Sequence, residues 1–295
     1  MQQFIFGLAN GSIYALMALA IGMVFSTTEI INFAHASVIM LAAMTSYWCM
    51  AYFHLSYILA ILIAVVINVL VNMLIYKTCV EKLGRLSANI GWIVTLFGAS
   101  IIIDNAARMY FGTEPQPYPY LFGGKVVHIL GANIMLHEIM MIVVSLAVGL
   151  AYQLLIQKTR FGRAVRAVSF RRDTARLMGI KSETTVLFCF GLAGVVAAIS
   201  GALIAPITFA SYNMMSFIGL KGFAAALIGG LGNTRGAFIG GISLGLIEAL
   251  IGSFLPAAYK DAISFFVMII VIIFLPGGIL GAKFFSKGRT GKEKI

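Results

Sequence analysis

The longest stretch without a charged side chain decides what this chain can fold into. From Ile30 to Tyr76, 47 residues pass without one Asp, Glu, Lys or Arg. A globular fold cannot hide such a run from water, whereas one helix crosses the hydrocarbon core of a bilayer with roughly 20 apolar residues. The run therefore holds two membrane passes, and we expect an integral membrane protein.

Composition excludes the other classes of protein. The chain has 295 residues, of which 61% are hydrophobic and 11% charged, while a soluble domain has about 25% charged residues. The cysteines are isolated, which excludes a disulfide scaffold. The net charge of +11 comes from basic residues gathered in a few short polar loops, so we expect no nucleic-acid partner.

Nine uncharged or nearly uncharged stretches are candidate membrane passes. The seventh is short, glycine-rich and contains Lys221, so a re-entrant or broken helix is the alternative there and eight passes remain a possible count. The fold class is all-α, a polytopic membrane helical bundle of 8–9 segments in one domain over 1–295. The stretches are Phe4–Phe25, Asn32–Tyr52, Tyr57–Tyr76, Asn89–Tyr110, Ile134–Gln157, Thr184–Ala205, Met214–Leu231, Gly236–Phe254 and Ala262–Ala282.

The basic residues predict which loops face the cytoplasm. Eight Lys and Arg residues lie in the loop 158–183, three lie between Lys77 and Arg85, and five lie in the tail 283–295. Short loops rich in Lys and Arg stay on the cytoplasmic side. With nine passes the N-terminus and the connection Gly112–Gly131 then face outward, and the C-terminus is cytoplasmic.

Small residues recur at four-residue spacing, as at Gly7 and Gly11, which lets helix backbones approach closely in lipid. The fourteen residues that begin at Gly7 share five identities with the fourteen that begin at Gly191. The two segments would cross the membrane in opposite directions, which is typical of an inverted repeat.

No catalytic signature is present. The chain has no GxxxxGK[ST] loop, and His137-Glu138 lacks the second histidine of HExxH. We therefore predict no catalytic residue, no resident metal and no cofactor, and we expect a protein that is not an enzyme.

The large basic loop predicts two short cytoplasmic helices. Asp173 is placed to cap the start of one helix and Gly179 to take the left-handed position after its end. Ahead of it, Ala164, Val165 and Val168 line one face of another helix, with its arginines turned away. A topology anchor needs only the charges. The capped, amphipathic pattern favours docking on a cytoplasmic partner.

Charged residues inside predicted passes are the second pointer to function, because each is costly in hydrocarbon. Asp104 and Arg108 are one helical turn apart and can pair. Lys221 and Glu248 add one positive and one negative charge, so the four charges sum to zero. Interior ion pairs are one reading, and an outward-facing vestibule for a polar solute is the other. The candidate pathway residues are Asn10, Asn32, His35, Asp104, Lys221 and Glu248.

Four sequence blocks together resemble one family from nearly end to end. They lie at Gly7–Leu16, Ile31–His35, Phe161–Ile180 (Phe161–Ala164 and Leu177–Ile180 within it) and Ile228–Ala237. In this order they resemble the branched-chain amino acid ABC transporter permeases of the LivH type.

The resemblance implies a multi-pass inner-membrane subunit that carries leucine, isoleucine or valine. Its implied partners are two ABC ATPase subunits, a second homologous permease and an extracytoplasmic amino-acid-binding protein. The segment Asp173–Gly179 resembles the EAA-type coupling motif, with Asp for Glu and Thr for the first Ala, and it lacks the downstream Ile and Leu-Pro. The coupling candidates are Arg163, Arg166, Asp173, Ala175 and Gly179.

Two alternatives stay open. Related permeases carry urea, short amides or other amino acids. An ion-coupled secondary transporter would need carboxylates near the bilayer midplane, and Asp104 and Glu248 lie too near the predicted outer side.

Overall fold

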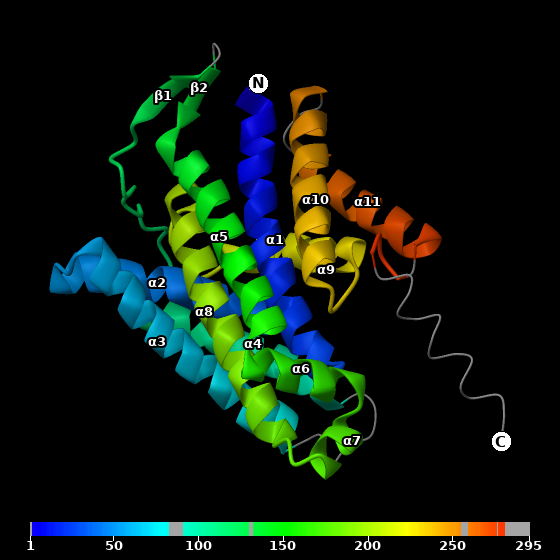
Figure 1. Cartoon of the computed structure of the whole chain (residues 1–295). Helices are drawn as coiled ribbons and strands as arrows, with labels where there is room; N and C mark the ends of the chain where they lie inside the picture. Colours follow the sequence, from blue (N-terminus) through cyan, green and yellow to red (C-terminus); the bar gives the residue numbers. More distant parts are fainter. Residues whose placement is uncertain (1, 83–90, 130–131, 255–258, 276, 281–295) are drawn as a thin grey trace. The chain divides into compact units, whose positions relative to one another are not determined.

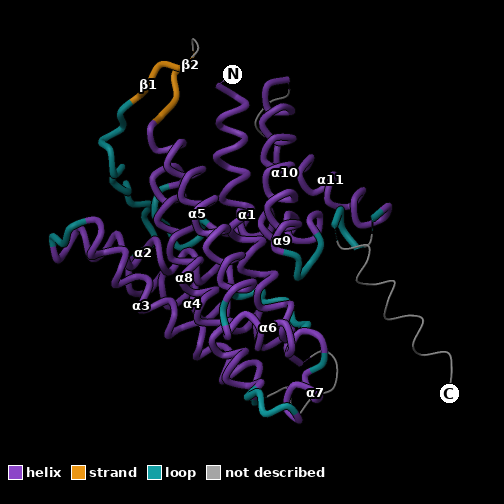
Figure 2. The backbone as a smooth tube through the Cα atoms, in the orientation of Figure 1, coloured by secondary structure: helices purple, strands orange, loops and turns teal. Residues whose placement is uncertain are grey.

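The computed structural model describes residues 2–82, 91–129, 132–254, 259–275 and 277–280 (Figure 1). Almost every element is helical, because a backbone in lipid must satisfy its hydrogen bonds within its own segment (Figure 2). The predicted tail 283–295 and part of the Lys77–Arg85 loop lie outside the described residues. The elements are α1 (Gln2–Thr28), α2 (His35–Phe53), α3 (Tyr57–Ile75), η1 (Tyr76–Glu81), α4 (Gly91–Phe111), β1 (Val126–Ile129), β2 (Ala132–Met135), α5 (Leu136–Lys158), α6 (Arg160–Phe170), α7 (Arg172–Leu177), α8 (Ser182–Thr208), α9 (Met215–Gly229), α10 (Thr234–Phe254) and α11 (Lys260–Phe274).

The predicted fold class is confirmed. Seven helices in the described ranges are long and apolar enough to cross a membrane. The other two predicted passes are the 15-residue helices α9 and α11. Helix α9 ends at Gly229, and the turn that follows places Gly230 and Gly232 at positive φ. At 1.5 Å per residue, 15 residues reach about 22 Å, short of the roughly 30 Å hydrocarbon core.

The chain forms two compact units. Unit 1 comprises residues 1–22, 122–149 and 220–295, and unit 2 comprises residues 23–121 and 150–219. The prediction of a single domain over 1–295 stays a prediction.

In unit 2, α8 packs against α3 and α2 (Figure 1). Glycines make this packing possible, because a Cβ on Gly194 would lie 2.7 Å from the carbonyl oxygen of Asn68. On α2, the Ile39 carbonyl would lie 2.5 Å from a Cβ on Gly201. Large apolar side chains of α3, among them Leu62, Val66 and Leu70, are exposed and form a face suited to lipid.

In unit 1, the first turns of α1 pack against α10 through glycine on both sides. A Cβ on Gly11 would lie 2.9 Å from the Ile242 Cα, and one on Gly245 would overlap the Gly11 backbone. Small residues at helix contacts are the usual device in lipid, where close van der Waals packing drives association.

Unit 1 also holds the strands. β1 and β2 pair antiparallel, with Val126 opposite Met135 and Val127 opposite Ile134. The predicted pass from Ile134 therefore starts as a strand, and the helix begins at Leu136. Within the connection Gly112–Gly131, which the sequence predicts to face outward, Val126–Ile129 forms β1, because β-branched residues such as Val126, Val127 and Ile129 favour a strand.

Candidate functional site

The first helix of the basic loop, α6, is built as the sequence predicts. Thr159 caps it, because its Oγ1 accepts the Gly162 N–H at 3.0 Å. Val165 and Val168 are each 3% exposed, Ala164 is half-buried and the arginines of the helix are exposed. The amphipathic face therefore packs α6 against the rest of unit 2, where α8 is the packing partner of α6.

A tight turn sets the angle between α5 and α6. A Cβ on Gly162 would overlap the backbone of Ile156, so only glycine fits there. The Arg166 guanidinium donates to the Ile156 carbonyl, one of the carbonyls that the end of a helix leaves without an intrahelical partner. Arg166, a predicted coupling residue, therefore fastens α6 to the end of α5, while the Arg163 side chain is exposed.

The end of the second helix, α7, is also as predicted. Gly179 has φ +79°, and its N–H donates to the Arg176 carbonyl at 2.9 Å while the Ile180 N–H donates to the Ala175 carbonyl at 3.0 Å. This bond pair is the Schellman motif, which satisfies carbonyls at a helix end. Ala175 is buried.

The predicted N-cap at Asp173 is wrong. The helix begins at Arg172, and the residue before it, Arg171, is extended with φ −156° and ψ 111° and makes no side-chain cap bond. Asp173 therefore lies in the first turn, where its carboxylate still complements the helix dipole. At the other end, the Arg176 guanidinium pairs with the Glu183 carboxylate at the start of α8.

Three exposed apolar side chains on these short helices were missed in the sequence. Phe170 is 84% exposed, Leu177 88% and Met178 79%. They lie among arginines in a segment whose remaining apolar residues are buried or half-buried, so they are not part of the unit's own packing. The signal was available, because Leu177 and Met178 stand next to the predicted C-terminal glycine, outside the amphipathic pattern.

A buried ionic cluster joins three helices of unit 1. The Lys221 Nζ of α9 lies 2.7 Å from the Glu248 Oε1 of α10, with side-chain exposures of 6% and 12%. The Tyr14 hydroxyl of α1 donates to the other Glu248 oxygen at 2.9 Å, and the Lys221 ammonium lies 5.9 Å from the Tyr14 ring centroid. The opposite charges cancel, as the sequence suggested.

The predicted pair between Asp104 and Arg108 does not form. Arg108 is exposed near the end of α4 and places its guanidinium 5.7 Å from the Tyr212 ring centroid. Asp104 is half-buried and within hydrogen-bonding reach of the Ser37 side chain. Spacing of i, i+4 permits a pair, but each side chain has a partner on another segment of unit 2.

Asn32 and His35 form the turn between α1 and α2. The Asn32 Oδ1 accepts the Ala34 N–H at 3.1 Å, and its carbonyl accepts the His35 N–H at 3.2 Å. Both side chains are buried, and the Asn32 Nδ2 and His35 Nε2 atoms have no hydrogen-bond partner among the residues that the structure describes. Buried polar atoms of this kind are costly unless a water or ligand meets them.

The six candidate pathway residues divide between the units. Asn10, Lys221 and Glu248 belong to unit 1, and Asn32, His35 and Asp104 to unit 2. A single vestibule lined by all six stays a prediction. Within the ranges that the structure describes, no three His, Cys, Asp or Glu side chains gather in a group that could hold a metal ion.

Comparison with known proteins decides the family. A model described as the permease component of the branched-chain amino acid transport system matches residues 3–272. The chain belongs to this permease family. All four sequence blocks of the resemblance fall inside this match. The resemblance found in the sequence is therefore confirmed.

The family's curated members cover the chain almost completely. The high-affinity branched-chain amino acid transport system permease protein LivH of Escherichia coli K12 is 31% identical over 293 residues, 95% of each chain. BraD of Pseudomonas aeruginosa, a permease protein of the same described system, is 29% identical over 293 residues, again 95% of each. A probable LivH of Methanocaldococcus jannaschii is 27% identical over 286 residues, 92% of this chain and 89% of that protein.

Proposed function

We propose that this chain is the membrane-spanning permease subunit of an ATP-binding cassette importer that carries leucine, isoleucine and valine across the inner membrane. The observation that carries the proposal is the family match over residues 3–272. The long apolar helices supply the membrane passage, and the helices α6 and α7 supply a surface for a separate ATPase. The chain itself hydrolyses no ATP in this proposal.

The proposed assembly has two ATPase subunits, a second homologous permease and an extracytoplasmic binding protein. Loop 158–183 faces the cytoplasm, since its eight Lys and Arg residues resist translocation. The C-terminus faces the same side. The binding protein delivers the solute to the opposite face.

The short helices α6 and α7 are fixed to longer helices, so they offer the ATPase a rigid contact surface. Thr159, Gly162 and the Arg166 contact with Ile156 fix α6 on α5, and the Schellman motif at Gly179 with the Arg176–Glu183 pair fixes α7 on α8. A movement of the loop therefore carries the ends of two long helices with it. Coupling requires contacts that differ between the ATP-bound and nucleotide-free states, and alternating access is the result.

The exposed residues Phe170, Leu177 and Met178 are the proposed contacts with the ATPase. Interfaces concentrate their binding energy in a few apolar side chains that become buried. The variant Leu177→Ala should reduce capture of the ATPase by the permease about tenfold. Leu121→Ala, which shortens an exposed leucine of the predicted outer connection, is the matched control and should leave capture unchanged.

Uptake by the reconstituted complex tests the function. Vesicles that contain the permease pair, the ATPases and the binding protein should accumulate leucine only with ATP. Accumulation without the ATPase subunits would support an ion-coupled secondary transporter instead. Urea or a short amide, offered to the same vesicles, tests the other solutes, and their uptake in place of leucine would contradict the proposal.

A further inference from the structure

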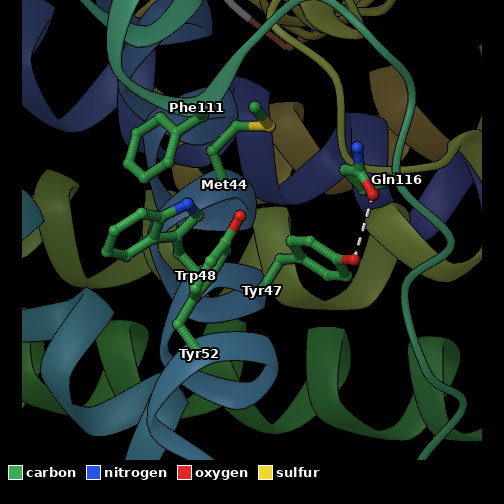
Figure 3. Close-up of a pocket in the computed structure, with 6 residues that line it drawn as sticks. All are labelled: Met44, Tyr47, Trp48, Tyr52, Phe111 and Gln116. Carbon is green, nitrogen blue, oxygen red and sulfur yellow. Dashed lines mark hydrogen bonds between the residues drawn. The ribbon is translucent and has the colours of Figure 1, made fainter.

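Four of the six side chains that line a small cavity in unit 2 are aromatic (Figure 3). Its volume is about 60 Å³, and it is partly open to the surface. Four lining residues come from the last three turns of α2, one from the end of α4 and one from the connection that follows α4. The lining residues are Met44, Tyr47, Trp48, Tyr52, Phe111 and Gln116.

The lining is held in place by contacts on each side. Met44, Trp48 and Tyr52 follow one another at four-residue spacing, which puts them on one face of α2. The Trp48 ring lies 4.3 Å from the Tyr52 ring and 5.9 Å from the Phe111 ring, centroid to centroid. The Tyr47 hydroxyl donates to the Gln116 Oε1 at 3.1 Å, the bond drawn in Figure 3.

The connection after α4 is anchored as well. Gln116 exchanges backbone hydrogen bonds with Ala210, both at 2.9 Å. The Tyr118 hydroxyl lies 3.0 Å from the Ser46 hydroxyl of α2. The cavity is therefore preformed within unit 2.

The same contacts place the cavity at one end of α8. The basic loop leads into α8 at Ser182, whereas Ala210, the partner of Gln116, lies two residues beyond the other end of α8 at Thr208. The 27 residues of α8 rise about 40 Å at 1.5 Å per residue. Because the basic loop is cytoplasmic in the proposed function, the cavity lies at the outer face, where the solute arrives.

The aromatic ring faces and the Met44 side chain offer a surface to an apolar group. No charged side chain lines the cavity, and the Tyr47 hydroxyl and the Gln116 amide are bonded to each other, whereas the Trp48 indole N–H and the Tyr52 hydroxyl are the other polar groups of the lining. The Met44 thioether adapts its shape to irregular apolar groups. A cavity of about 150 Å³ holds the six carbons of benzene, so a space of about 60 Å³ suits an alkyl group of about two or three carbons, such as the isopropyl group at the end of a leucine side chain.

We propose that this aromatic cavity binds the branched aliphatic side chain of the solute as it enters from the outer face, while the rest of the amino acid stays outside the cavity. The inference rests on the proposed function, since it names where that solute is first recognised. It assigns a specificity role to Trp48, Tyr52 and Phe111. A cation held against the rings, as in aromatic cages for ammonium groups, is the rival occupant.

Photo-crosslinking of the assembled complex in lipid nanodiscs tests the site. The probe is a leucine analogue with a diazirine in its side chain, and labelled peptides are identified by mass spectrometry. We expect labels within 44–52 and 111–116, with protection by excess leucine and by 4-methyl-2-oxopentanoate, which has the same side chain without an ammonium group. Glycine should not protect.

Two exposed tyrosines beside Trp48 provide the matched variants. Tyr52, 65% exposed, lines the cavity, while Tyr110, 72% exposed, contacts Trp48 and is not a lining residue. Loss of one aromatic contact should raise the leucine concentration needed for half protection about 3- to 10-fold in Tyr52→Ala. Tyr110→Ala should change it less than 2-fold.

Three results would overturn the inference. One is the absence of labels in both peptides, and another is protection by glycine equal to that by leucine, which would indicate an ammonium site. The third is labelling by a diazirine phospholipid that leucine does not displace, which would make a lipid chain the occupant. Labelling needs no transport, so a complex that imports leucine without labelling the cavity refutes this inference alone.

Discussion

Neutralising the buried ion pair of unit 1 one charge at a time should destabilise the protein far more than neutralising both. Lys221 and Glu248 lie 2.7 Å apart and are 6% and 12% exposed. At an effective dielectric constant of roughly 20, their Coulomb attraction is about 6 kcal/mol. Most of this attraction offsets the cost of removing both charges from water, so the pair's net contribution is small.

The single variants expose that cost. Lys221→Met leaves the Glu248 carboxylate buried with the Tyr14 hydroxyl as a remaining donor, and Glu248→Gln leaves a buried ammonium. Each should lower the free energy of unfolding by about 3–5 kcal/mol. The double variant Lys221→Met with Glu248→Gln should stay within about 1 kcal/mol of the parent, and Tyr14→Phe should cost about 1.5–3 kcal/mol.

Titration of the purified protein in detergent with dodecyl sulfate unfolds it and measures these differences in the free energy of unfolding. The free energies of the four proteins form a double-mutant cycle, which isolates the interaction between the two side chains. The reasoning is refuted if each single variant costs less than about 1 kcal/mol, or if the double variant costs the sum of the two.

Three further perturbations have defined outcomes. Gly245→Val should lower the unfolding temperature strongly, because the new side chain would overlap the Gly11 backbone. Gly98→Ala, with nothing within 4 Å of a new Cβ, should instead raise the free energy of unfolding by about 0.5–1 kcal/mol in the same thermal assay. Equal effects of the two variants would contradict the packing account. Gly179 has φ +79°, so Gly179→Val should uncouple ATP hydrolysis from leucine uptake while assembly persists. Gly179→Asn should retain more coupling than the valine variant, since Asn tolerates this backbone region. Normal uptake by the valine variant in vesicles would refute this prediction. Thr159→Ala removes the N-cap of α6 and should destabilise this helix by about 1 kcal/mol. The loss should be measured as faster amide hydrogen exchange in α6. Unchanged exchange would contradict a stabilising role for the cap.

The sequence was sufficient wherever local physics decides the structure. Val165 and Val168 are buried and Gly179 is left-handed, because amphipathic spacing and a helix C-terminus act over one or two turns. Gly7 and Gly191, the first residues of the two similar segments, each face a neighbouring helix, at Ala249 and Met73. The inverted repeat itself stays a prediction.

Partners distant in the sequence were beyond this reasoning. Asp104 and Arg108 have the spacing of a pair, yet their partners come from other segments of unit 2, and no local pattern encodes that choice. Tyr14 and Glu248 are 234 residues apart. The aromatic cavity has the same origin, since Gln116 joins the α2 residues through contacts made only in the folded unit.

Accessibility of the basic loop tests the central claim most directly. Single cysteines at exposed loop positions such as Thr174, in a chain whose Cys49, Cys79 and Cys189 are replaced by serine, are treated in intact cells with a maleimide that cannot cross membranes. The account predicts no labelling until the membrane is opened, and then labelling that the bound ATPase subunits block. Labelling from the outside of sealed cells would contradict it.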